Sequence, residues 1–132
     1  MDRKDIIKYV CVVVLLIAID APYLYSTKNM YQQRTQGISG KPLTKRYYSG
    51  LVVYLAIALA MVIFALPRIR KDNIVLDSIT YGGILGVTTY AVFDFTMHFM
   101  FEGWDIGVSV LDSLWGGILF SLVAIIITLC FK

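Results

Sequence analysis

Residues 81–120 read YGGILGVTTYAVFDFTMHFMFEGWDIGVSVLDSLWGGILF, and this stretch decides the fold. It contains two apolar segments joined by the short polar link EGWD at residues 102–105. Each segment carries an aspartate, Asp94 or Asp112, well away from its polar end. A carboxylate is costly to bury in apolar surroundings, so each aspartate must be paired, protonated or in contact with water. The stretch therefore predicts two membrane segments with a polar site inside them.

The whole chain is as apolar as this stretch. Of its 132 residues, 58% are hydrophobic and 16% are charged, and the mean hydropathy is +0.73. Such a chain cannot form a water-soluble globule with an ordinary polar surface. Four apolar blocks each have about 20 residues or more, enough to cross a hydrocarbon core of about 30 Å. They predict an all-α integral membrane protein, an antiparallel four-helix bundle in one domain (1–132), with spans at about 6–25, 47–66, 75–101 and 106–131.

The connection at residues 26–46 is polar and basic. Its first part, residues 28–35, fits a short helix along the membrane interface as well as it fits an ordinary solvated loop. Before it, Pro22 is expected to kink or end the first span, because proline removes a backbone donor. Tyr23 and Tyr25 are interpreted as part of the interfacial aromatic belt.

The charge pattern indicates a partner and an orientation. The net charge of +3 is spread over segments that flank the apolar blocks. This pattern favours contact with the lipid bilayer and its anionic headgroups over nucleic-acid binding. Lysine and arginine number 7 on the side that holds both termini, against 5 in the first loop and none in the turn at residues 102–105. We therefore expect a multi-pass protein whose N- and C-termini face the cytoplasm.

The third block places one residue of interest every four positions. Gly82, Gly86, Tyr90, Asp94 and His98 thus share one face of a helix. The two glycines form a small-xxx-small pattern that lets a neighbouring helix approach closely. His98 has two interpretations: a proton relay or metal site shared with Asp94, or a solvated histidine at the end of the span. No further nitrogen or sulfur ligands are apparent nearby, so neither a metal nor a cofactor is expected.

The fourth block repeats this design. Ser109, Asp112 and Gly116 lie three and four positions apart on one face, with Trp115 beside them. Gly116 is expected to pack against the glycines of the third block.

Three aspartates are predicted to lie at one level of the membrane. Asp20, Asp94 and Asp112 are each about 8 to 11 Å inside the same face, at 1.5 Å per residue. No lysine or arginine lies at that depth, so at least one carboxyl must hold a proton. We expect Asp94 and Asp112 to be closest. The candidates for binding a proton, a cation or a small polar ligand are Asp20, Asp94, Asp112, Tyr90, His98, Trp115 and Ser109, and the helix-packing candidates are Gly82, Gly86 and Gly116.

These motifs resemble those of a known family. The pattern is an aspartate late in the first span, Y-x-x-x-D-x-T in the third, a tryptophan in the turn, and D-x-x-W-G in the fourth. It resembles an uncharacterised family of small four-span membrane proteins, a domain of unknown function found in bacteria with relatives in large DNA viruses. The resemblance implies the architecture and no activity. The residues that carry it are Asp20, Tyr90, Asp94, Thr96, Trp104, Asp112, Trp115 and Gly116.

Several functions stay open. The aspartates can fix the register of the bundle through hydrogen bonds. They can instead bind a proton, a cation or a polar ligand in a small transporter that acts as a homo-oligomer. The resemblance adds a structural protein of a viral inner membrane, which would contact capsid proteins through residues 28–46. A membrane-embedded enzyme is disfavoured, because the chain has no HExxH, no glycine-framed nucleophile and no aspartate pair at the spacing used by membrane alcohol-phosphatidyl transferases.

Overall fold

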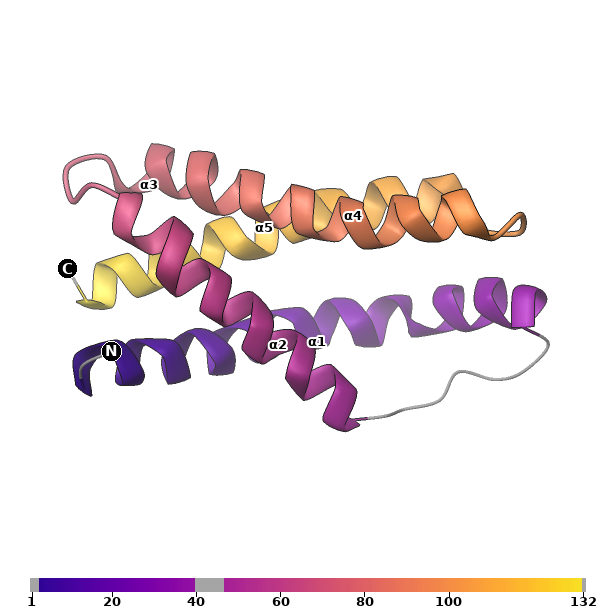
Figure 1. Cartoon of the computed structure of the whole chain (residues 1–132), viewed down its shortest axis with the longest axis horizontal. Helices are drawn as coiled ribbons and strands as arrows, with labels where there is room; N and C mark the ends of the chain where they lie inside the picture. The colour runs from indigo at the N-terminus through magenta and orange to yellow at the C-terminus, as the bar shows by residue number, and fades with distance from the viewer. Residues whose placement is uncertain (1–2, 40–46, 132) are drawn as a thin grey trace.

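The computed structural model describes residues 3–39 and 47–131, and side chains within residues 3–26 and 48–131. Over these residues the chain is all-α, as the sequence predicts (Figure 1). The elements are α1 (Arg3–Ser39); α2 (Tyr47–Ala60), the π-helical turn η1 (Met61–Ala65) and the 3-10 turn η2 (Leu66–Arg68); α3 (Ile74–Asp77), the π-helical turn η3 (Ser78–Gly83) and α4 (Ile84–Met100); and α5 (Ile106–Phe131).

The helices form an antiparallel bundle. α4 and α5 run side by side as a hairpin closed by the turn at residues 102–105 (Figure 1). α1 lies along the same axis and contacts α5, while α2 crosses α1 obliquely. The start of α1 and the end of α5 lie at one end of the bundle, and the 102–105 turn lies at the other. We call these the terminal end and the turn end.

The lengths and surfaces of the helices fit a membrane. Among the described residues, three helices are long and apolar enough to cross one: Arg3–Ser26, Tyr48–Arg68 and Ile106–Phe131. The fourth segment, residues 74–100, is divided by the π-helical turn η3 but follows α5 along its length. Large apolar side chains such as Val52, at 61% exposure, cover the outer surface. Lipid tails make favourable contacts with such side chains. The helices satisfy the hydrogen-bonding groups of the backbone inside the bilayer.

The first helix is longer than its apolar part. Pro22 lies inside α1 and does not end it, and α1 continues to Ser39. In lipid a helix is the only open structure that satisfies the backbone groups on both sides of such a proline, so the helix passes through it. Residues 28–35 are therefore helical and do not form the solvated loop that was the other predicted alternative. Residues 40–46, the rest of the predicted loop, lie outside the described residues.

The apolar core fills the terminal half of the bundle. It includes Val12 and Leu16 of α1, Met61 of η1, and Phe120 and Val123 of α5, all fully buried. Asp20 is one helical turn beyond Leu16, toward the turn end. The fold thus places Asp20, Asp94 and Asp112 on the turn side of this apolar core.

A separate ion pair holds the short connection between η2 and α3. The backbone N–H and Nε of Arg70 each donate to Oδ2 of Asp77 at 2.9 Å. Nδ2 of Asn73 donates to Oδ1 of the same carboxylate at 3.3 Å. Asp77 lies in the first turn of α3, and its contacts with Arg70 and Asn73 also hold the preceding turn in place.

Candidate functional site

Glycines bring α4 and α5 into backbone contact. A Cβ atom added to Gly86 would lie 2.1 Å from the carbonyl oxygen of Gly116, and one added to Gly116 would lie 2.7 Å from that of Gly86. Only a hydrogen atom fits in either place. A Cβ at Gly82 would meet Ala124 Cβ at 3.2 Å. Because the two backbones touch, the side chains two turns beyond Gly86 on α4 and one turn before Gly116 on α5 are brought close together.

Those side chains are Asp94 and Asp112. Asp94 is fully buried, and within the described part of the chain no N–H or hydroxyl group donates to either of its oxygens. The group with which it interacts across the seam is the carboxyl of Asp112. The hydroxyl of Tyr23 donates to Oδ1 of Asp112 at 3.3 Å. Two carboxyls can hydrogen-bond to each other only if one of them keeps a proton.

Asp20 has a different environment. It is 5% exposed, and each of its oxygens accepts a hydrogen bond from an uncharged group. Nε1 of Trp115 donates to Oδ1 at 2.7 Å, and the hydroxyl of Tyr54 donates to Oδ2. Donors of this kind stabilise the ionised carboxylate. The three residues come from α1, α2 and α5, so this set of contacts joins three helices at one point.

An aromatic stack connects the two sets. The rings of Tyr23 and Trp115 are stacked, with centroids 4.6 Å apart and an interplanar angle of 9°. Trp115 binds Asp20 while Tyr23 binds Asp112. Tyr90 packs edge-on against Phe120, with centroids 6.0 Å apart, and lies close enough to Asp20 and Asp112 to interact with both electrostatically. We call Asp20, Asp94, Asp112 and these aromatic partners the carboxyl cluster.

Two predicted site residues lie beside the cluster and do not bind a carboxyl. The hydroxyl of Ser109 donates to the backbone carbonyl of Asp94 at 3.0 Å and accepts from Nε1 of Trp104 at 3.0 Å. His98 is exposed, and its Nδ1 lies 3.1 Å from the carbonyl oxygen of Trp104. His98 makes no hydrogen bond to Asp94. Both side chains fix the turn end of the hairpin.

Two members of the cluster were missed from the sequence. Tyr54 lies in the second apolar block and is not among the predicted site residues, although a phenol in the middle of an apolar run is a signal for a buried acceptor. Tyr23 was assigned to the interfacial belt, but its hydroxyl points at Asp112. Its position three residues after Asp20 places it on the same side of α1, which is the signal that could have identified it.

The cluster is not arranged as a metal site. Within the described residues, no three His, Cys, Asp or Glu side chains are grouped so that they could hold one metal ion. Asp20 therefore forms a site of its own next to the pair of Asp94 and Asp112.

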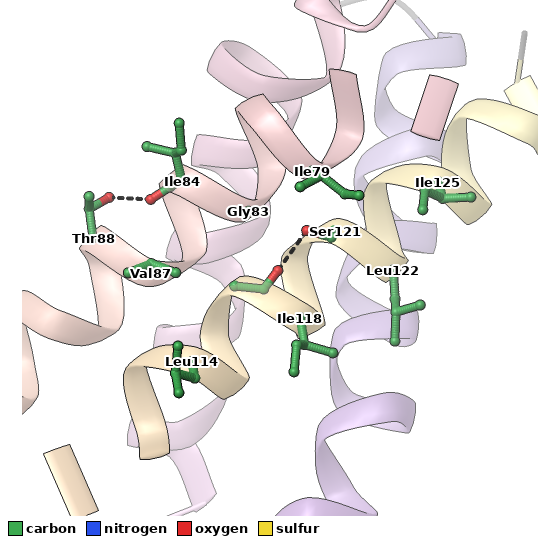
Figure 2. Close-up of a pocket in the computed structure, with 11 residues that line it drawn as sticks. Ile79, Gly83, Ile84, Val87, Thr88, Leu114, Ile118, Ser121, Leu122 and Ile125 are labelled. Carbon is green, nitrogen blue, oxygen red and sulfur yellow. Dashed lines mark hydrogen bonds between the residues drawn. The ribbon is translucent and has the colours of Figure 1, made fainter. Parts of the chain in front are cut away.

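A groove on the outside of the α4–α5 hairpin is a separate feature. Figure 2 shows this groove, of about 650 Å³, between apolar side chains of η3, α4 and α5. The hydroxyls of Thr88 and Ser121 donate to carbonyls of their own helices, at 2.8 Å to Ile84 and 2.7 Å to Gly117. No charged residue lines the groove, so it offers nothing that would hold a polar ligand.

Comparison with known proteins supports the architecture. Neither the curated proteins nor the solved structures give a match to the chain. Residues 5–129 match the family described as "Predicted membrane protein (DUF2177)". That range includes the complete carboxyl cluster and both helices of the glycine-packed hairpin. The chain therefore belongs to this family of membrane proteins of unknown function.

Proposed function

We propose that Asp94 and Asp112 form a proton-binding site inside the membrane and that the protein uses it to carry protons across the membrane. The observation that carries the proposal is the environment of Asp94, a fully buried carboxyl whose facing partner is another carboxyl. In a medium of low dielectric constant two adjacent negative charges repel strongly. One proton held between the two groups removes one charge and supplies the missing hydrogen-bond donor.

The position of the pair supports exchange with water. Asp94 lies six residues before the end of α4, and Asp112 lies six residues after the start of α5. At 1.5 Å per residue both are about 9 Å from the turn end of the bundle. Loss of the shared proton would leave a negative charge on each of two helices whose backbones touch. The repulsion between these charges would weaken the packing of α4 against α5.

We assign Asp20 a structural role beside the proton-binding pair. Its carboxyl accepts hydrogen bonds from two uncharged donors and so joins α1, α2 and α5 at one point. Each oxygen of Asp20 thus already has a donor, unlike the oxygens of Asp94. We therefore assign proton binding to the pair and the fixing of helix positions to Asp20.

Infrared spectroscopy of the protein in lipid tests the proton-binding site. A carboxylic acid has a C=O stretching band well separated from that of a carboxylate. We expect this band in the wild type at neutral pH, and its loss in Asp94→Asn and in Asp112→Asn. The amide of asparagine can donate to the remaining carboxylate, so both variants should stay folded. Asp20→Asn is the matched control and should keep the band. A wild type without the band, or a band that survives in both pair variants, contradicts the site.

Reconstitution tests the use of the site. Proteoliposomes that contain a pH-sensitive dye should acidify under an imposed proton gradient with the wild type. The same vesicles with folded Asp94→Asn should show the rate of empty vesicles. Equal rates for the wild type and the variant would refute transport through the pair.

A further inference from the structure

Tyr23 connects the carboxyl pair to α1. Its hydroxyl donates to Oδ1 of Asp112 at 3.3 Å, and its ring is stacked on the ring of Trp115. Residues 21–26 are the last residues of α1 whose side chains the structure describes, and among them Tyr23 alone is not exposed. In residues 21–26, the side chain that packs inward against α5 is therefore that of Tyr23.

The two carboxyls of the pair differ in their donors. Within the described part of the chain, no N–H or hydroxyl group donates to either oxygen of Asp94. Asp112 accepts the hydroxyl of Tyr23. A donor of this kind stabilises a carboxylate in its ionised form, whereas a buried carboxyl without such donors is more stable with its proton. These contacts favour the negative charge of the pair on Asp112 and the proton on Asp94.

The two carboxyls also differ in exposure. Asp94 is 0% exposed, whereas Asp112 is partly exposed. A proton on Asp94 therefore leaves the pair by way of Asp112. In that step an O–H bond at Asp94 breaks, an O–H bond at Asp112 forms, and the negative charge moves to Asp94. The charge of Asp112 thus decides when the pair can take up or release a proton.

Titratable groups of two neighbouring helices interact with Asp112. Asp94 and Tyr90 belong to α4, and Tyr23 belongs to α1. Asp20 of α1 already has a donor on each oxygen. The hydroxyl of Tyr23 is thus a contact through which α1 acts directly on the charge of Asp112.

We propose that Tyr23 is the positioning residue of the pair: its hydroxyl holds the negative charge on Asp112 and the shared proton on Asp94. The role of Tyr23 rests on the proposed function. It also sets the pH at which Asp112 takes up a second proton, because that proton has to replace the ionised form that Tyr23 stabilises. Hydrogen bonds to charged groups are roughly twice as strong as those between neutral groups. Uptake of the second proton therefore weakens the contact between α1 and α5 at Tyr23.

Infrared difference titration of the protein in lipid tests this role. In the difference between Tyr23→Phe and the wild type, the remaining carboxyls cancel. A positive carboxylic acid C=O band should appear only in the pH interval in which Asp112 is neutral in the variant and still ionised in the wild type. The interval should be about one pH unit wide, the low end of what a hydrogen bond to a charged group contributes, because the distance of 3.3 Å is long. The same difference should show no band when both proteins also carry Asp112→Asn.

Two further variants separate the hydroxyl contact from packing. Replacement of Tyr23 by 3-fluorotyrosine keeps the contact but makes the hydroxyl a stronger donor, so the difference band should be negative. This variant tests the sign independently of how well Tyr23→Phe folds. Tyr9→Phe is the matched control, because the hydroxyl of Tyr9 donates from the same helix to the carbonyl of Leu55 at 2.8 Å. Its difference from the wild type should show no C=O band.

The results distinguish the role of Tyr23 from the proposed function. A wild type that has the band at neutral pH, with no difference band for either change at Tyr23, would refute the role and leave the pair standing. Difference bands of the same sign for both changes would be an effect of packing and would also refute it. A wild type without the band at neutral pH would overturn the pair and the role together. Difference bands of the expected signs in a protein that transports no protons would refute transport and support the role of Tyr23.

Discussion

Replacement of Gly86 by alanine tests the close contact on which the carboxyl pair depends. The added Cβ would lie 2.1 Å from the carbonyl oxygen of Gly116, whereas an ordinary contact begins at 3.4 Å. The helices would have to separate by the difference of about 1.3 Å, and a gap of 0.5 to 1 Å already loses a quarter to a half of the dispersion energy of an atom pair. Overpacking of this kind costs about 1 to 3 kcal/mol.

Gly50→Ala provides the matched control, because nothing lies within 4 Å of the position of its Cβ. Alanine is favoured over glycine in a helix by about 1 kcal/mol, so this variant should be neutral or stabilised. Gly86→Ala gains the same helix preference, so we expect the free energies of unfolding of the two variants to differ by the overpacking cost alone, about 2 kcal/mol. Titration with sodium dodecyl sulfate, followed by tryptophan fluorescence, measures this difference. Equal midpoints for the two variants would show that the backbones of α4 and α5 are not in contact at Gly86.

Three further predictions concern the donors to Asp20, the carboxyl pair and the orientation of the chain in the membrane. Tyr54→Phe removes one of the two donors to Asp20 and should destabilise the bundle by about 1 to 3 kcal/mol, since a buried acceptor left without its donor costs this much. The exposed Tyr48→Phe should change little in the same titration. Cysteines placed together at Asp94 and Asp112 should cross-link with a short bifunctional reagent in the membrane, and the absence of a cross-link in folded protein would contradict the facing pair. A tag at the C-terminus should be accessible only after intact cells are permeabilised, whereas labelling from outside would reverse the expected orientation.

The sequence alone determined the class of fold and much of the hairpin. Apolar blocks of sufficient length and the near absence of charge within them leave helices as the only structure that satisfies the backbone in lipid. Spacing by four residues then puts Gly82, Gly86 and Asp94 on one face of a helix, whatever that helix packs against. The link at residues 102–105 is too short to let the third and fourth segments separate. Local spacing and chain connection were therefore enough to predict that Asp94 and Asp112 lie close to each other.

The partners of Asp20 were decided only by the tertiary structure. Contacts between α1, α2 and α5 depend on how each helix is rotated about its axis and on the oblique crossing of α2 (Figure 1). The second span is apolar on all sides, so its sequence does not state which face turns inward. Lipid accepts any of these faces, and no hydrophobic driving force selects one. Close packing in the bundle makes the selection, and it is this packing that turns Tyr54 toward Asp20 and Tyr23 toward Asp112.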